Sequence, residues 1–290
     1  MRVTESRLWQ LSTDAVGGAR ERVAQAGDVL QTGVKVDRPS DDLAAWGQGE
    51  RAAVRDAMSE HRGTAIASAR DTLSAADAAL ATVSTSLTKL TEIGVQAANG
   101  TLSASDRTGL AAEVAQLKSA SLGAVNGKAL DGSYLFGGSQ TASLPFAAGG
   151  AYQGDLVSRS IETGEASQLA VGVTGDALTA ANGVDVLGLF DTLATALGAN
   201  DVATIQATLP ALQQAVAQVA TLRTSVGTRI AALDGADDAR KSFELQLAQT
   251  HARAVEADPV EAASNLTAAS NALEAARASA QTILSLLQGG

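Results

Sequence analysis

Both ends of this chain carry apolar residues that recur every three or four positions, with a glycine-rich stretch between them. Near the start the recurring positions are Trp9, Val16, Ala19, Val23, Ala26 and Leu30. Near the end they are Leu266, Ala269, Leu273, Ala276, Ala280, Ile283 and Leu287. This heptad spacing is typical of helices that pack side by side. The sequence therefore predicts two terminal helices separated by an insertion.

Alanine occupies many positions of the two terminal seams, so each seam is weak. Burial of an alanine side chain contributes little at ~25 cal/mol per Å², and helices of this length are marginal when isolated. We therefore expect these helices to need partners, either neighbouring subunits or each other. The predicted subunit-interface residues are Trp9, Val16, Val23, Leu30, Leu266, Leu273, Ile283 and Leu287.

Helix-breaking residues border both terminal segments. We predict that the first helix stops at Gly33, because glycine readily adopts the left-handed conformation after a helix C-terminus. The predicted hinge and cap residues that follow are Arg38, Pro39, Ser40, Asp41 and Asp42. The proline disfavours helical geometry before it, the serine can cap a helix that restarts near residue 41, and the two aspartates suit that helix's positive end. Asp258-Pro259 forms a matching break before the last helix.

Longer apolar seams predict an inner helical rod. One seam covers residues 66–97 and ends at Asn99-Gly100, after which Ser103 predicts the N-cap of a helix that folds back on the first. Helical spacing returns at 186–197 and again at 202–233. In the latter segment Pro210 predicts a kink or a helix restart, because proline lacks the backbone donor.

The helical period is absent from residue 131 to about 183, where two runs alternate around Thr163-Gly164-Glu165 as the strands of a hairpin would. We therefore predict a mainly α fold, an elongated antiparallel helical bundle or coiled coil with a small β-rich insertion at its tip. Three domains are expected: residues 1–33 with 259–290, residues 34–130 with 200–258, and residues 131–199.

Composition and charge exclude several functions. The net charge of -10 argues against nucleic-acid binding and against anionic membranes. There is no cysteine, and no run of about 18 apolar residues could span a bilayer. The opening residues also lack the apolar stretch of a cleaved secretory signal.

Candidate catalytic and metal-binding residues are few. The two histidines, His61 and His251, lie in separate helical segments, and we interpret both as surface residues. Asp234, Asp237 and Asp238 do not fit a calcium loop, because the expected glycine and glutamate positions hold other residues. We expect no enzyme activity, cofactor or metal. Four insertion aromatics could form a carbohydrate patch or, as we prefer, a small core; they are Tyr134, Phe136, Phe146 and Tyr152.

Several of these segments resemble the flagellin-like axial proteins of bacterial flagella. Residues 38–42 followed by Ala44-Ala45 resemble the sequence after that family's hinge, although Leu43 stands where members at the hook-filament junction commonly have proline. Residues 97–107 resemble the helix-turn-helix tip that flagellins and junction proteins share.

The insertion carries the motif that separates the two branches of this family. Residues 134–138, 145–146 and 152–155 are similar to the entry into the outer domain of junction members, a block that flagellins usually lack. Residues 225–229 and the closing run to Leu287 also match the family's carboxy-terminal half. The resemblance covers nearly the whole chain and is weakest between 165 and 200.

This resemblance implies a structural, hook-associated adaptor that joins hook to filament. The implied partners are identical subunits in a ring, a neighbouring hook-associated protein, flagellin, an export chaperone and the flagellar type III export apparatus. The implied location is the extracellular flagellum, reached without a cleaved signal peptide. The alternatives are flagellin itself and, less favoured, a cytoplasmic coiled-coil scaffold.

Overall fold

The computed structural model describes residues 2–288, and packing divides the chain into two units. The first unit comprises residues up to 58 together with those from 243 onward, and the second comprises residues 59–242. Two long helices contribute to both units, α2 (Leu43–Ala97) and α5 (Val202–Val255). The three-part domain division expected from the sequence remains a proposal.

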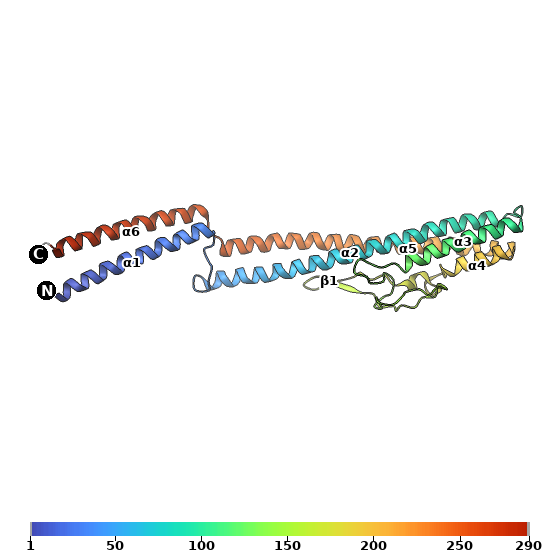
Figure 1. The fold of residues 1–290 in the computed structure, drawn as a ribbon, viewed down its shortest axis with the longest axis horizontal. Coiled ribbons are helices and arrows are strands. Elements are labelled where there is room, and N and C mark those ends of the chain that lie inside the picture. Colours follow the sequence, from blue (N-terminus) through green and yellow to red (C-terminus); the bar gives the residue numbers. More distant parts are fainter. Residues whose placement is uncertain (1, 289–290) are drawn as a thin grey trace. The chain divides into compact units, whose positions relative to one another are not determined.

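The first unit contains the terminal helices α1 (Arg2–Thr32) and α6 (Pro259–Gln288). They pack against one another and run antiparallel, as the blue and red ribbons of Figure 1 show. The predicted stop of the first helix is confirmed, because α1 ends at Thr32 and Gly33 has a φ of 69°. The final helix begins at Pro259, as the Asp258-Pro259 break predicted.

The second unit is built around α2 and α5, whose apolar seams share one core. The α2 leucines Leu73, Leu80, Leu87 and Leu90 are fully buried in it. So are the α5 seam residues Ile205, Leu212, Val219 and Leu233. Polar contacts also join the two helices, because Arg223 of α5 forms an ion pair with Asp77 of α2 at 2.9 Å. The predicted antiparallel packing of long helices is therefore confirmed.

Two shorter helices complete the core of the second unit. α3 (Ala104–Val125) begins with a capping box in which Ser103 and Asp106 cap each other's backbone, as the sequence predicted. α4 (Gly188–Gly198) packs against α3 and buries Phe190, Leu193 and Leu197. Pro210 does not restart α5, which runs unbroken from Val202 to Val255. The buried residues Ile205 and Leu212 on either side of the proline hold that turn in the core.

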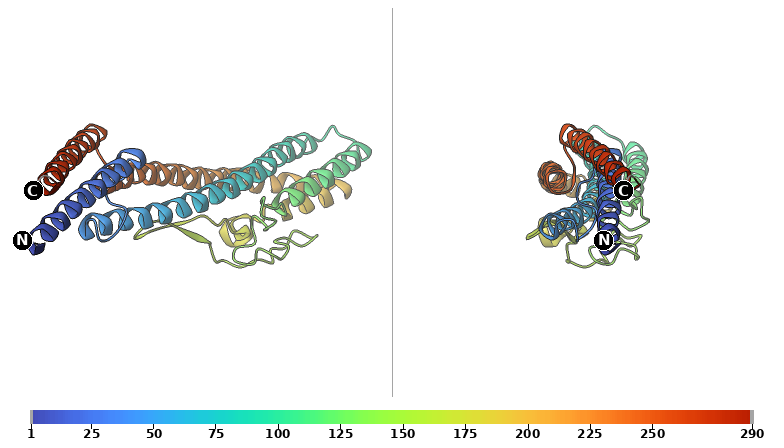
Figure 2. Two further views of the ribbon diagram at one scale, coloured as in Figure 1. Left: turned by 60° about the vertical axis from the view of Figure 1, so that its left-hand side comes forward. Right: turned by 90° about the vertical axis from the view of Figure 1, so that its left-hand side faces the viewer.

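The predicted hairpin is present as β1 (Ser160–Gly164) and β2 (Ser167–Ala170), which pair antiparallel with Ile161 opposite Leu169. Two short 3₁₀ turns follow, η1 (Gly175–Leu178) and η2 (Ala180–Asn182). Figure 2 shows this insertion along one flank of the helices of the second unit. The mainly α fold with a small two-stranded sheet agrees with the predicted fold class. The predicted position of the insertion at the tip is wrong, because β1 lies beside α2, where Glu162 pairs with Arg62 (Figure 2).

A small aromatic core holds the loops of the insertion together. Phe136 and Phe146 are fully buried, and the ring centroid of Phe146 lies 5.3 Å from that of Tyr152. The Tyr152 hydroxyl lies within hydrogen-bond distance of two backbone oxygens to which it can donate, those of Phe136 (3.1 Å) and Asp155 (2.7 Å). Burial raises the pKa of this hydroxyl. Tyr134 instead lies under the Lys128 ammonium, at 4.6 Å from the ring centroid. The core interpretation of these aromatics therefore holds for Phe136, Phe146 and Tyr152.

Candidate subunit interface

The predicted terminal seams lie at the contact between α1 and α6. The described seam residues Val16, Val23, Leu266, Leu273 and Ile283 are all half-buried, and Ala19 and Ala262 are the most buried apolar residues of the two helices. The two helices therefore form an internal pair, which was one of the two alternatives. The side chain of Leu287 lies outside the residues whose side chains the structure describes.

The pair leaves large apolar side chains of α1 in contact with solvent. The side chain of Trp9 is 46% exposed and that of Leu30 is 39% exposed. Leu8 (47%) and Leu11 (61%) are also exposed, and with Trp9 they form the apolar surface near the N-terminal end of α1. The predicted seam does not include Leu8 or Leu11, because both residues stand outside the heptad positions. Contiguous exposed apolar residues of this kind are typical of interaction surfaces.

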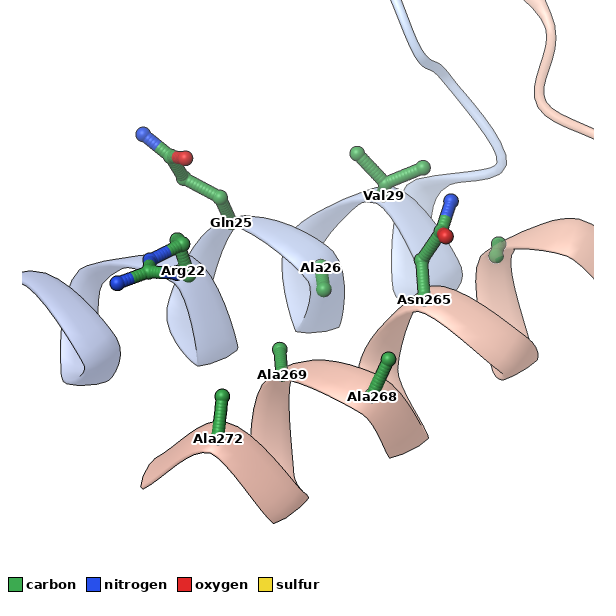
Figure 3. A pocket seen from close by; sticks show the side chains of 9 residues that line it. Arg22, Gln25, Ala26, Val29, Asn265, Ala268, Ala269 and Ala272 are labelled. Carbon is green, nitrogen blue, oxygen red and sulfur yellow. The ribbon is translucent and has the colours of Figure 1, made fainter. Parts of the chain in front are cut away.

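An open groove runs between the same two helices, with a volume of about 440 Å³. Figure 3 shows α6 alanines, including Ala269 and Ala272, pointing toward α1 across this groove. On the α1 side the groove is lined by Arg22, Gln25, Ala26 and Val29. Small side chains leave this space because their Cβ atoms cannot fill the gap between two helices.

The two connectors of the first unit are hydrogen-bonded to each other. Val34 and Glu256 form an isolated antiparallel bridge, and the backbone N–H of Lys35 donates to the carbonyl oxygen of Val255 at 2.8 Å. The N–H of Ala257 donates to the carbonyl oxygen of Gly33, also at 2.8 Å. Backbone hydrogen bonds thus join the end of α1, the end of α5 and the start of α6, and the sequence pattern did not predict these contacts.

Aspartates cap the helices that leave these connectors. Asp42 Oδ1 accepts from the backbone N–H groups of Ala44 (2.9 Å) and Ala45 (3.0 Å). Asp258 Oδ1 accepts from Val260 N–H at 2.8 Å in the same way. The cap of α2 is therefore Asp42 and not Ser40, because α2 begins at Leu43 and an N-cap side chain must stand immediately before the first helical residue.

The other predicted hinge residues form the exposed turn before this cap. Asp41 Oδ2 accepts from the backbone N–H groups of Asp37 (3.2 Å) and Arg38 (3.1 Å). The Arg38 guanidinium lies 3.7 Å from the Asp37 carboxylate, and both side chains are more than three-quarters exposed. Pro39 and Ser40 are exposed in the same turn. Asp41 thus organises the turn, and Asp42 starts the helix.

A buried arginine organises the turns that follow α2 and α4 in the second unit. Arg107 is 3% exposed, and its guanidinium donates to the carbonyl oxygens of Ala97, Asn99 and Leu102 at 2.9 to 3.1 Å. A fourth bond reaches Asn200 Oδ1 at 2.6 Å, in the turn between α4 and α5. One of these acceptors, the carbonyl oxygen of Ala97, is the last of α2, where a cation near the helix C-terminus is stabilising. Sequence reasoning placed Arg107 in the tip motif but did not predict this role.

Asp237 of α5 forms ion pairs with Arg240 and Lys241. Hydrogen bonds from Lys241 and Arg240 lower the pKa of Asp237, and the partner Lys241 pKa is raised. His61 is exposed and His251 is half-buried in the first unit. Within residues 2–288, no group of three or more histidines and carboxylates could hold a metal ion. In the same range, no helix is both long and apolar enough to cross a membrane.

Comparisons with known proteins match both halves of the chain. A family model described as the bacterial flagellin N-terminal helical region matches residues 13–141. The flagellar hook-associated protein 3 of Salmonella typhimurium is 27% identical over 261 residues, which cover 82% of this chain and 82% of that protein. The protein of the same name from Escherichia coli is 28% identical over 177 residues, which cover 61% of this chain and 56% of that protein.

A solved structure shows the same fold. It is assigned as a flagellar hook-associated protein from Vibrio parahaemolyticus, is 25% identical, and superposes with a TM-score of 0.68 over 74% of this chain and all of that one. The resemblance predicted from the hinge, tip and insertion motifs is therefore confirmed.

Proposed function

We propose that this chain, as a flagellar hook-associated protein of the flagellin-like family, is a structural subunit that joins the hook of the bacterial flagellum to its filament. The similarity to hook-associated protein 3 over 82% of the chain carries this proposal. The role is one of assembly, and it agrees with a structure whose main unsatisfied feature is apolar surface on a terminal helix pair.

The proposed contacts between subunits involve the terminal seams. Trp9, Val16, Val23 and Leu30 of α1, with Leu266, Leu273, Ile283 and Leu287 of α6, are proposed to pack against the same helices of identical neighbours in a ring. Half-burial supports this, because a pair of helices has only one contact face each, and the seam residues gain further burial only from additional helices. A neighbouring hook-associated protein and flagellin are proposed to flank the ring.

The proposed location is the extracellular flagellum, reached through the flagellar type III export apparatus with the help of an export chaperone. The matched relatives are flagellar components, which supports the location. The Arg38 to Asp42 turn is proposed as a hinge, because its residues are exposed and only short connectors join α1 to α2 and α5 to α6.

A charge on the exposed seam tests this function. We expect Trp9→Asp to leave the melting temperature of the monomer unchanged within about 2 °C, because this side chain is 46% exposed. In the host bacterium the same variant should be exported but should fail to hold filaments, since burying an unpaired carboxylate in a subunit interface costs several kcal/mol. Flagellin should then accumulate in the medium.

Val54→Asp is the matched control, because Val54 is 52% exposed in the first unit but lies on α2 rather than on a terminal seam. Normal motility of the control with loss of filaments in Trp9→Asp supports the proposal. Normal filament numbers in Trp9→Asp would remove α1 from the interface. Deletion of the gene with no loss of filaments would remove the junction role altogether.

Flagellin is the second candidate, because the family model that matches residues 13–141 describes a flagellin segment. The two functions differ in self-assembly. A filament subunit should polymerise into long filaments when purified alone, whereas a junction protein should not. Electron microscopy of the concentrated protein therefore separates them.

A further inference from the structure

The chain contains three asparagine-glycine pairs, at residues 99–100, 126–127 and 182–183. In such a pair the backbone nitrogen of the glycine can attack the side-chain carbonyl carbon of the asparagine, because glycine has no Cβ to obstruct the approach. The attack needs a free side chain and a free glycine N–H. All three pairs can undergo this reaction, so a difference in their reaction rates must come from their surroundings in the folded protein.

Two of the pairs are held by hydrogen bonds. The Asn126 side chain donates to the carbonyl oxygen of Phe146 and accepts from its N–H, both at 3.0 Å, and Gly127 N–H donates to Ala124 at 3.0 Å. The Asn182 amide donates to the carboxylate of Asp176 at 2.8 Å and to its backbone oxygen at 3.0 Å. Cyclisation at either site requires these bonds to break first.

In the Asn99-Gly100 pair hydrogen bonds hold the backbone N–H and carbonyl of Asn99, but the two reacting groups, the Asn99 side chain and the Gly100 N–H, lack such restraints. Both residues are exposed, and no hydrogen bond joins the Asn99 side chain or the Gly100 N–H to any other group in the described part of the chain. A Cβ built on Gly100 would meet no atom within 4 Å, so the space on that side of the backbone is open. We propose that Asn99 is a site of spontaneous deamidation at the tip of the second unit.

The reaction balances with water as the only co-reactant. The Gly100 nitrogen loses its proton and bonds to Cγ of Asn99, the Cγ–Nδ2 bond breaks, and ammonia leaves from a cyclic succinimide. Water then opens the ring at Cγ to give aspartate, or at the backbone carbonyl carbon of residue 99 to give isoaspartate. In isoaspartate the former backbone carbonyl becomes a free carboxylate.

Arg107 gives the isoaspartate product a specific partner. The backbone oxygen of Asn99 already accepts from Arg107 Nη2 at 2.9 Å. Opening the ring at this carbonyl carbon converts a neutral acceptor into a carboxylate on the same guanidinium, and charge-assisted pairs of this kind are the stronger ones. The fold therefore favours isoaspartate over aspartate at residue 99.

Peptide mass spectrometry of the full chain during incubation at mildly alkaline pH tests the proposal. Breaking one net hydrogen bond slows a reaction by about fivefold to tenfold, so Asn99 should deamidate at least about tenfold faster than Asn126 or Asn182 in the folded protein. In strong denaturant the three rates should converge. A native rate at Asn99 no faster than at the other two sites would overturn the proposal, as would the same ranking in denaturant.

Gly100→Ala is the matched variant, because its added Cβ meets no atom and Gly100 is not among the described glycines with positive φ. It should slow deamidation at Asn99 severalfold without changing the melting temperature. An unchanged rate would exclude attack by the residue 100 nitrogen. The isoaspartate fraction at residue 99 should be larger in the native protein than in denaturant, and equal fractions would refute the role of Arg107.

Discussion

Replacing Arg107 by methionine should destabilise the second unit by about 3 to 5 kcal/mol, because it leaves several acceptors around a buried guanidinium without a donor. The guanidinium is 3% exposed and makes four hydrogen bonds. Methionine keeps most of the aliphatic volume. It donates no hydrogen bond, so the acceptors of Arg107 lose their donor. This loss costs about 1 to 3 kcal/mol of stability for each acceptor that is buried.

Arg70→Met is the matched control, because Arg70 does have a carboxylate partner. Its guanidinium lies 3.2 Å from the Asp234 carboxylate, but its side chain is 57% exposed. Exposed ion pairs contribute about 0 to 1 kcal/mol. If ion pairs alone determined stability, Arg70 would contribute more than Arg107. Burial and the number of hydrogen bonds in the structure predict the reverse order.

Urea unfolding followed by far-ultraviolet circular dichroism measures both variants. Tryptophan fluorescence is unsuitable, because Trp9 and Trp46 both belong to the first unit. We expect a lower midpoint for Arg107→Met with an unchanged slope. A loss below about 1 kcal/mol, or equal losses in the two variants, would refute the reasoning that burial and bond number determine the contribution.

Three further predictions follow from the same structure. Leu80→Ala should lower the free energy of unfolding by about 2 to 5 kcal/mol in urea, because Leu80 is fully buried, and a negligible change would place that seam outside the core. Hydrogen bonds from Ser103 lower the folded-state pKa of Asp106. The capping contribution of Asp106 to stability is therefore present above pH 3.8 and is lost as the pH falls through the lowered pKa. The melting temperatures of the wild type and Asp106→Asn should become equal at that low pH. A difference in melting temperature that stays constant with pH would contradict this. Hydrogen exchange in the monomer should be fast in α1 and α6 and slow at residues 66–97, and slow exchange throughout would disprove the weakness of the terminal seams.

Features that depend on a few neighbouring residues were predictable from the sequence. The Ser103–Asp106 capping box joins residues three positions apart, and the helix stop at Gly33 needs only one residue that tolerates positive φ. The seam of α2 was readable because its core residues recur at a period that helix geometry fixes. The cap of α2 was misplaced at Ser40, since serine and aspartate cap almost equally well and only the observed helix start separates them.

Contacts between distant parts of the chain were not predictable in this way. Asn200 binds Arg107 from 93 residues away, and Glu256 pairs with Val34 across more than two hundred residues. Neither pair has a residue type or spacing that identifies its partner. These contacts exist because long antiparallel helices bring their ends together. The positions of those ends depend on the lengths of the helices, and single residues at the connectors determine where each helix begins and ends.

The terminal seams mark the limit of the sequence in another respect. A heptad pattern identifies the face of a helix that packs, but it contains no information on whether the partner belongs to the same chain. The structure supplies one partner, since α1 packs on α6. This partner leaves apolar surface uncovered, because Leu11 remains 61% exposed and every described seam position of α6 from Leu266 to Ile283 is only half-buried. Two helices enclose no interior, so full burial of these side chains requires further helices. If they come from neighbouring subunits, Trp9→Asp should abolish assembly without unfolding the monomer.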